Sequence, residues 1–451
     1  MDKRCLSGDD QMPDYATSED PRVQRQLNRL ERLAPDGDTL GLERIRKLLG
    51  RLCNPQRHLP PVFHVAGTNG KGSTCAFLRA AIESAGLAVH VYSSPHLVRF
   101  NERIRIGGEL VSDAQLADLL SETLDHAGDI GASFFEVTTA AALLAFSRAP
   151  AAACIIEVGL GGRLDATNVI SRPAACGIAQ LGLDHEAFLG STAEAIAAEK
   201  AGIAKPGSPL VTMEYPASIR AVIMDAARHA GAELRECGSS WTYAADERGV
   251  WYQDDRGSLM LGTSMLAGGH QAANLALAAA MLRHQSALAV PDTAIVAAAG
   301  GVRWPARMQR LGKGPLTASF GERPVWLDGG HNPAAGTAIA AALAASNADA
   351  YESQDVTMIA GMLANKDAMG FLTPLVPLIS RFIAVPVAGH DHHHPEALAE
   401  IARRAGVADA VSVSDLRCAI EKATAGSGPI FIGGSLYLAG KVLRENDEVP
   451  V

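Results

Sequence analysis

The fold is decided by residues 62–74, which read Val62-Phe63-His64-Val65-Ala66-Gly67-Thr68-Asn69-Gly70-Lys71-Gly72-Ser73-Thr74. An apolar strand signal runs into a glycine-rich turn and then into a helix. The glycines let successive backbone N–H groups point at one anion, the positive helix end faces the same point, and the lysine can reach outer phosphates. A plain strand-to-helix turn is the alternative, but a turn requires neither the lysine nor two hydroxyls. The stretch predicts a phosphate-binding loop made of Gly67, Thr68, Asn69, Gly70, Lys71, Gly72 and Ser73.

The composition narrows the class of protein. A chain of 451 residues is too long for one ordinary core, so two domains are expected. The net charge of −9 argues against a nucleic-acid binder. Seven scattered cysteines without a C-x-x-C pair indicate free thiols in a reducing compartment. No secretory signal or membrane-spanning stretch is visible, so we expect a cytoplasmic protein with no membrane partner.

Strand and helix signals alternate along the chain. Strands are expected at 62–66, 88–92, 153–158 and 176–181, with helical stretches such as 73–85 and 137–146 between them. This alternation predicts an α/β fold whose N-terminal domain is a P-loop-type, doubly wound, mostly parallel sheet. Shorter polar runs over 232–264 predict a small antiparallel insert, followed by a helix from 270 to about 286.

A second alternating unit predicts a smaller C-terminal Rossmann-like α/β domain. Its strands are expected at 325–328, 356–361, 382–386, 410–413 and 430–433. Because no G-x-G-x-x-G follows its first strand, a dinucleotide cofactor is not expected. The predicted organisation is a polar leader over 1–21, for which disorder is one reading, an ATP-binding domain over 22–303, a linker over 304–323 and the C-terminal domain over 324–451.

Polar residues follow the strands of the first predicted sheet. Ser94 follows the second strand, Glu157 closes the third, and Asp184 with His185 follows the fourth. In a doubly wound sheet these positions converge at the carboxyl edge, beside the phosphate loop. Hydroxyl and carboxylate oxygens suit Mg²⁺, whereas an imidazole is an unusual ligand for it. A capping or ion-paired glutamate and a core histidine are the structural alternatives.

The loop departs from the common pattern G-x-x-x-x-G-K-[ST], because Val65 replaces the first glycine and Gly72 follows the lysine. The form G-T-N-G-K-G-S resembles the ATP loop of the Mur ligase superfamily, in particular the folylpolyglutamate synthase and dihydrofolate synthase family. Further matching pieces cover most of the chain: Tyr92–Leu97, Phe135-Glu136, Glu157–Asn168, Leu183-Asp184-His185, Glu199–Ile203, His270-Gln271 with Asn274, Pro305-Ala306-Arg307, Asp328–Pro333 and Gly434-Ser435.

The resemblance implies roles for particular residues. It implies Mg²⁺ ligands at Ser94, Glu157 and His185, with two metal sites expected. Lys200 matches a lysine that is carbamylated by CO₂, which requires a neutral amine and would supply a carboxylate to the second metal ion. A solvated surface lysine is the alternative for that position. Lys71, Lys200 and His185 are therefore the expected catalytic residues.

The resemblance also assigns the nucleotide and substrate contacts. Nucleotide contacts are implied at Asn274, Arg307, Asp328 and His331, with Asn332-Pro333 also readable as a plain helix start. Ala306 departs from the family, which usually has glycine there, so the placing of Arg307 is open. The substrate-binding residues implied are Ser133, Phe134, Phe135, Glu136, Leu164, Asp165 and Ala166; a phenylalanine pair that only packs a helix start is the alternative.

The implied function is an ATP- and Mg²⁺-dependent ligase. It would add L-glutamate to dihydropteroate, to tetrahydrofolate or to both, through an acyl phosphate. A Mur ligase acting on a UDP-linked peptide and an ATP-driven switch protein are the alternatives. The expected partners are these small molecules, with no nucleic acid, and a monomer is expected. The run His390-Asp391-His392-His393-His394 reads as a polar loop, because neighbouring histidines in a turn cannot close a tetrahedral metal site alone.

Overall fold

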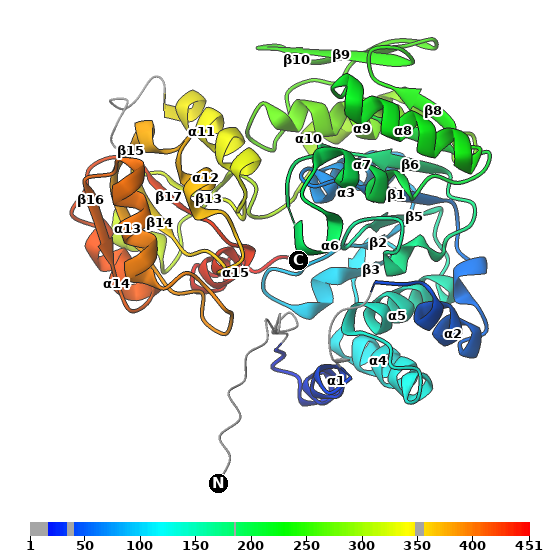
Figure 1. Ribbon diagram of the computed structural model, residues 1–451, viewed down its shortest axis with the longest axis horizontal. Helices are drawn as coiled ribbons and strands as arrows, with labels where there is room; N and C mark the ends of the chain where they lie inside the picture. The colour runs from blue at the N-terminus through cyan, green and yellow to red at the C-terminus, as the bar shows by residue number, and fades with distance from the viewer. Residues whose placement is uncertain (1–16, 34–39, 185, 348–355) are drawn as a thin grey trace.

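The computed structural model describes residues 17–33, 40–184, 186–347 and 356–451. The predicted leader lies outside the described residues over 1–16, and its last residue, Pro21, begins helix α1 (Pro21–Glu31), whose N-cap is Asp20. The molecule consists of two lobes, one built from the first two thirds of the chain and one from the last third (Figure 1). No helix in the described ranges is both long and apolar enough to cross a membrane.

The first lobe is built on an eight-stranded sheet. The strand order is β4-β3-β2-β5-β1-β6-β7-β8. Only the pairs β2–β3 and β3–β4 are antiparallel among the described strands of this sheet, which confirms the predicted doubly wound, mostly parallel sheet. The strands are β1 (Val62–Ala66), β2 (Val89–Tyr92), β3 (Ile104–Ile106), β4 (Glu109–Leu110), β5 (Ala153–Glu157), β6 (Ala175–Ile178), β7 (Pro209–Thr212) and β8 (Glu233–Glu236).

Helices cover both faces of this sheet. Phe63 and Val65 of the central strand β1 point to one face, where α3 (Lys71–Ser84), α9 (His270–Arg283) and α10 (Asp292–Gly301) pack. Val62 and Ala66 point to the other face, because side chains alternate along a strand. That face is covered by α1, α2 (Glu43–Arg51), α4 (Asp113–Ala127), α5 (Phe134–Arg148), α7 (Ala193–Ala201) and α8 (Ala217–Ala230), and α6 (Glu186–Leu189) precedes α7.

A three-stranded antiparallel sheet caps one end of the first lobe, as the sequence predicts. It consists of β9 (Trp241–Asp246), β10 (Gly249–Asp254) and β11 (Gly257–Met260), and it lies at the top of the first lobe in Figure 1. Arg283 of α9 fastens it through two hydrogen bonds of 2.7 Å to the buried Asp254 carboxylate. The expected start of this insert at 232 is wrong, because β8 instead extends the main sheet in parallel.

The second lobe contains a six-stranded sheet with the order β12-β13-β17-β14-β15-β16. Only β12 is antiparallel, in line with the predicted Rossmann-like arrangement. The strands are β12 (Gln309–Arg310), β13 (Val325–Leu327), β14 (Val356–Ala360), β15 (Ile379–Ala384), β16 (Asp409–Ser412) and β17 (Ile430–Gly433). The helices are α11 (Pro333–Asn347), α12 (Ala368–Leu372), α13 (Pro395–Ala405), α14 (Leu416–Ala423) and α15 (Leu436–Glu445).

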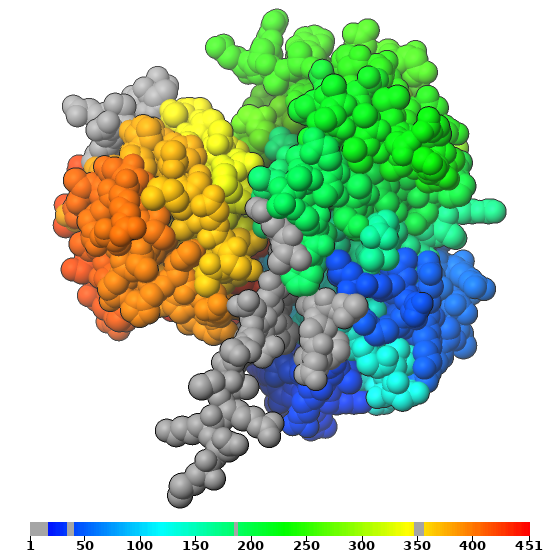
Figure 2. Space-filling model, viewed as in Figure 1, coloured from blue at the N-terminus to red at the C-terminus, as the bar shows by residue number. Residues whose placement is uncertain are grey.

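The predicted linker over 304–323 contributes to the second lobe. Its strand β12 pairs with β13, and Leu311, Leu316 and Phe320 pack into the core that α14 and α15 cover. Short 3₁₀ helices complete the fold at Pro55–Arg57, Phe100–Arg103, Ala166–Val169, Thr317–Phe320 and Val376–Leu378. The two lobes form separate masses that meet along one side (Figure 2). The exact domain boundaries stay a prediction.

Candidate functional site

The predicted phosphate loop connects β1 to α3 at the carboxyl edge of the first sheet. Gly70 immediately precedes α3 with a φ of +81°, and a Cβ built on it would lie 2.3 Å from the Oδ1 atom of Asn274. A Cβ on Gly72 would lie 2.8 Å from the Trp304 ring. Both positions therefore require glycine, one for its backbone angle and both for close approach. Lys71 Nζ donates to the carbonyls of Gly67 at 3.0 Å and Thr68 at 3.2 Å.

The same loop is tied to the segment that follows β6. The backbone N–H groups of Thr68 and Asn69 both donate to the Gln180 carbonyl, at 2.8 and 3.2 Å. The Thr68 hydroxyl donates to the Gly182 carbonyl at 2.9 Å and accepts from the Gly182 N–H at 3.1 Å. These contacts hold the loop beside Asp184, so two of the segments that the sequence expects to converge do so.

Glu157 and Ser94 lie together, as their positions after neighbouring strands predict. The Ser94 N–H donates to Glu157 Oε2 at 3.4 Å, and within the described part of the chain the carboxylate accepts no other hydrogen bond. Glu157 is 5% exposed, and burial raises its pKa, against the opposing charge of Lys71. A buried, weakly satisfied carboxylate beside a hydroxyl fits a hard cation such as Mg²⁺.

The expected metal site is not complete within the described residues. His185, the third expected ligand, lies outside them. Among the residues that are described, no three His, Cys, Asp or Glu side chains gather in a way that could hold a metal ion. Of the expected ligands, Glu157 and Ser94 are thus the two that the described residues bring together, and nucleotide phosphates or a modified lysine are further oxygen donors of the kind that Mg²⁺ prefers.

Lys200 is the buried cation of the site. It lies near the end of α7, is 5% exposed, and is packed under the turn at Gly162, where a Cβ would approach its Cα to 2.9 Å. Burial, followed by the repulsion of Lys71, lowers the pKa of the Lys200 ammonium to about 7, while Asp184 and Asp165 oppose the shift. The surface-lysine alternative is therefore wrong, and a substantial fraction of this amine is neutral near pH 7.

Arg307 and Asp328 are expected nucleotide contacts in the second lobe, and the chain segments that carry them contact each other. Asp328 is buried, and its carboxylate accepts from the Met308 N–H at 2.8 Å and from the Gly330 N–H at 2.7 Å. Arg307 donates to the Ala306 carbonyl at 2.8 Å. Ala306 is buried and has a φ of +53°, so alanine here adopts the left-handed backbone that glycine adopts freely.

His270 is a residue that the sequence matched without giving it a role. It opens α9, and its Nε2 accepts from the Gln271 side-chain amide at 3.1 Å, which places the ring proton on Nδ1. That Nδ1 is buried and has no partner within the described residues. Burial lowers the His270 pKa; the charge of Asp328 raises it, and the charge of Arg307 lowers it further. His270 therefore lies near the predicted nucleotide contacts of both lobes.

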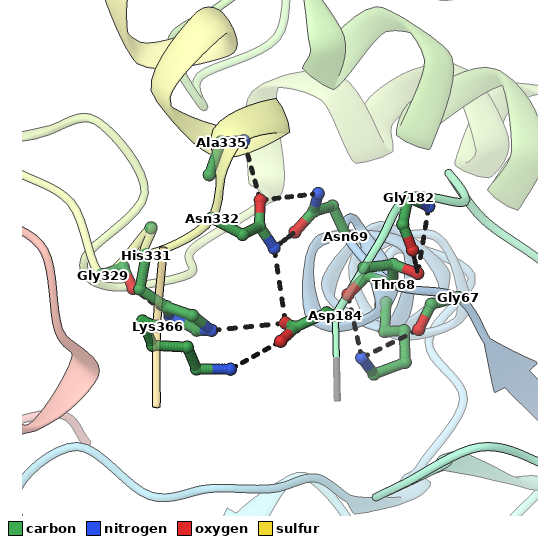
Figure 3. A network of polar contacts seen from close by, with 12 residues as sticks. Gly67, Thr68, Asn69, Gly182, Asp184, Gly329, His331, Asn332, Ala335 and Lys366 are labelled. Carbon is green, nitrogen blue, oxygen red and sulfur yellow. Dashed lines mark hydrogen bonds and ion pairs between the residues drawn. The ribbon is translucent and has the colours of Figure 1, made fainter. Parts of the chain in front are cut away.

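A polar network joins the two lobes directly above the phosphate loop (Figure 3). Asn69 and Asn332 exchange side-chain hydrogen bonds of 3.3 and 3.1 Å. Asp184 accepts from Lys366 Nζ at 2.6 Å and lies 3.7 Å from His331 Nε2. The sequence expected His331 to face the nucleotide phosphates from the second domain. Its ring lies beside Asp184, and the contact with phosphate stays a prediction. Lys366 was missed, because nothing in its local sequence distinguishes it from a surface lysine.

Four of the expected substrate residues, Ser133, Phe134, Phe135 and Glu136, lie at the start of α5. Ser133 is the N-cap of α5, and Glu136 closes the capping box by accepting from the Ser133 N–H at 2.7 Å. Glu136 Oε2 also accepts from Arg44 at 2.9 Å, whereas its Oε1 is buried with no partner within the described residues. Phe134 packs edge-on against Phe100 with ring centres 5.9 Å apart.

The other expected substrate residues lie in the turn after β5. Phe135 packs over Gly159, where a Cβ would meet the ring at 2.3 Å. Asp165 is 2% exposed, and its carboxylate accepts hydrogen bonds from the Leu160 N–H at 2.9 Å and from the backbone N–H and the hydroxyl of Thr167. The Asp165 carboxylate therefore stabilises the turn through these hydrogen bonds. Leu164 beside it is half-buried, and Ala166 is buried. The substrate role of the whole set stays a prediction.

Comparisons with known proteins agree with this geometry. Residues 317–445 match the family model described as dihydrofolate synthetase, C-terminal domain. The dihydrofolate synthase/folylpolyglutamate synthase of Escherichia coli is 35% identical over 363 residues, covering 80% of this chain and 81% of its own. Escherichia coli FolC solved in complex with DHPP and ADP has a TM-score of 0.84 at 32% identity, covering 94% of this chain and 97% of its own. A Yersinia pestis bifunctional enzyme complexed with AMPPNP and Mn ion has a TM-score of 0.82 at 32% identity, with the same coverage of both chains.

Proposed function

Because this chain belongs to the dihydrofolate synthase/folylpolyglutamate synthase family, we propose that it joins the amine of L-glutamate to a pterin-linked carboxylate at the expense of ATP. The observation that carries the proposal is that Asn332 of the second lobe bonds both to Asn69 of the phosphate loop and to Asp184 of the first lobe. Lys71 of the same loop is close enough to Glu157 for their charges to interact. A nucleotide on the loop would have its outer phosphates between these groups.

The reaction proceeds in two chemical steps. The substrate carboxylate attacks the γ-phosphate, which gives an acyl phosphate and ADP; the glutamate amine then attacks the acyl carbon and displaces phosphate. Magnesium, when bound, neutralises phosphate charge and aligns the attacking oxygen. Ser94 and Glu157 supply oxygens for that ion, and His185 is the third proposed ligand.

Lys71 stabilises the charge that develops on the transferred phosphoryl group. Its ammonium now donates to two carbonyls of its own loop, which places it at the mouth of the phosphate cradle. A swing of the side chain away from those carbonyls lets the ammonium reach β- and γ-phosphate oxygens. Asn274 of the first lobe lies over Gly70, and Arg307 and Asp328 belong to the second lobe. The base, ribose and inner phosphates are therefore held from both lobes.

Carbamylation of Lys200 supplies a carboxylate for a second metal ion. The neutral amine attacks CO₂, forms a C–N bond and releases a proton, which turns a buried cation into a buried anion. The lowered pKa supports this reaction, because only the unprotonated amine is a nucleophile.

The pterin is held by the wall formed by Ser133, Phe134, Phe135, Glu136, Leu164, Asp165 and Ala166. Aromatic faces stack on a flat heterocycle, and the unpartnered Glu136 Oε1 accepts from its amino group. Asp165 and Ser133 act by shaping the turn and the helix start that present these groups.

The deciding experiment measures ADP release and amide formation by the purified protein. Mg-ATP and L-glutamate are supplied with dihydropteroate in one series and tetrahydrofolate in another. Release in both series means two activities, and release in one identifies the substrate. Lys71→Ala abolishes release, whereas Lys313→Ala, which removes an exposed lysine of the second lobe, leaves it unchanged. No release in either series, from protein that binds ATP, would overturn the proposal. A monomeric state and a cytoplasmic location stay predictions.

A further inference from the structure

Two charged side chains face each other across the junction of the lobes. Lys366, in the turn after β14, donates to Asp184, which follows β6, at 2.6 Å. The side chains are only 9% and 12% exposed, so solvent screens this ion pair far less than the surface pairs of the protein. The two residues are 182 positions apart in sequence. Figure 3 shows the pair beside the phosphate loop.

The histidine run explains why Lys366 is held in that place. His393 Nε2 lies 2.9 Å from the Lys366 carbonyl, and because a carbonyl only accepts, the histidine nitrogen donates. The His393 N–H donates to the Met362 carbonyl at 2.9 Å, and the Ala364 N–H donates to the Asp391 carbonyl at 3.2 Å. These three hydrogen bonds hold the turn 362–366 against the loop 390–394.

The ion pair belongs to a longer set of contacts that reaches the phosphate loop. Asp184 also accepts from Asn332 at 3.4 Å, and Asn332 exchanges hydrogen bonds with Asn69. The Asn332 Oδ1 atom in turn caps the first turn of α11 by accepting from the Ala335 N–H at 2.9 Å. The position of α11 over the loop thus depends on side chains that the second lobe presents to Asp184.

We propose that Lys366 is a positioning residue that fastens the second lobe over the phosphate loop, and that His393 fixes the turn from which it does so. The catalytic consequence rests on the proposed function. With the lobes fastened, water is kept from the acyl phosphate. With them loosened, water attacks the acyl phosphate, the carboxylate and inorganic phosphate are released, and ADP is formed without amide.

The test uses the full-length protein with Lys366→Met, Lys366→Arg and His393→Ala. Lys313→Met is the matched control, because Lys313 forms a 2.9 Å ion pair with Glu322 in the same lobe, but both side chains are almost fully exposed. Two quantities are measured: the radius of gyration by X-ray scattering without added ligands, and the ratio of ADP released to amide formed. The melting temperature of each variant identifies any that fail to fold.

In Lys366→Met we expect a larger radius of gyration and an ADP-to-amide ratio raised by at least about twofold. His393→Ala should shift both quantities in the same direction by less, Lys366→Arg should restore both, and Lys313→Met should change neither. Scattering requires no turnover, so an unchanged radius in folded Lys366→Met and His393→Ala overturns the proposal even if the ligase activity is absent. An unchanged ratio in those variants, with an active wild type, overturns the coupling to water exclusion.

Discussion

The side-chain amide of Asn274 lies directly over Gly70, so that a Cβ on the glycine would stand 2.3 Å from Asn274 Oδ1. Asn274 is itself held by a hydrogen bond of 2.9 Å from its Nδ2 to Gln271 Oε1 inside α9. The predicted phosphate loop and a predicted nucleotide contact are therefore in van der Waals contact. Any change of shape in one is transmitted to the other.

Gly70→Ala should weaken ATP binding by at least about tenfold, because the new methyl group displaces Asn274 and distorts the loop. Gly86→Ala is the control. Gly86 has a similar φ of +73° but no atom within 4 Å of a built Cβ. It suffers only the backbone strain of about 1–2 kcal/mol, with nucleotide affinity unchanged. Calorimetric titration with ATP separates the two; equal losses of affinity would show that backbone strain, and not Asn274, is responsible.

The carbamate on Lys200 should form increasingly as pH rises through about 7. Burial lowers the pKa of this lysine to about 7, so the amine is protonated and unreactive below that pH and neutral above it. Nuclear magnetic resonance with ¹³C-bicarbonate should show a carbamate signal that grows from pH 6 to pH 8.5 and is missing in Lys200→Ala. Partial recovery of Lys200→Ala activity by a short carboxylic acid would support the same role. A signal that persists in Lys200→Ala would assign the carbamate to another amine.

Ala306→Gly should stabilise the protein slightly, by about 0.5–1 kcal/mol. The φ of +53° costs alanine about 1–2 kcal/mol, and glycine removes that strain but gains about 0.5–1 kcal/mol of unfolded-state entropy. Chemical denaturation measures the change. Ala298→Gly, inside α10, should instead destabilise by about 1 kcal/mol or more. A destabilised Ala306→Gly would mean that the methyl group, which is fully buried, contributes more by packing than the backbone strain costs.

Glu136→Gln should raise the KM for the pterin substrate about tenfold or more while leaving the fold intact. Glutamine still closes a capping box, but the charge that strengthens the hydrogen bond at Oε1 is lost, at about 1.5–3 kcal/mol. Ser112→Ala removes the equivalent cap of α4 and serves as the control, with about 1 kcal/mol lost in stability and an unchanged KM. An unchanged KM in Glu136→Gln would leave Glu136 with its structural contacts to Ser133 and Arg44 alone.

Short-range sequence patterns were sufficient to predict most of the strands and helices and part of the candidate site. The strands at 62–66, 153–158 and 430–433 could be predicted because buried parallel strands are short apolar runs that end at glycine or polar residues. Strand β7 was missed although three of its four residues are buried. The edge strand β8 was misplaced into the insert, since its partly exposed residues carry a weaker apolar signal. Ser94 and Glu157 could be placed together because parallel strands deliver their carboxyl ends to one edge.

The sequence alone determined that this chain has a phosphate loop on a parallel sheet, followed by a second α/β unit, because glycine positions and apolar periodicity act over a few residues. Only the tertiary structure decided that Asp184 meets Lys366, that Asn274 lies over Gly70 and that Glu136 caps a helix. It also decided that Lys200 is buried, which lowers the pKa of its ammonium to about 7. Contacts between residues far apart in the chain, and the burial that shifts a pKa, depend on how helices and lobes pack, which no local pattern encodes.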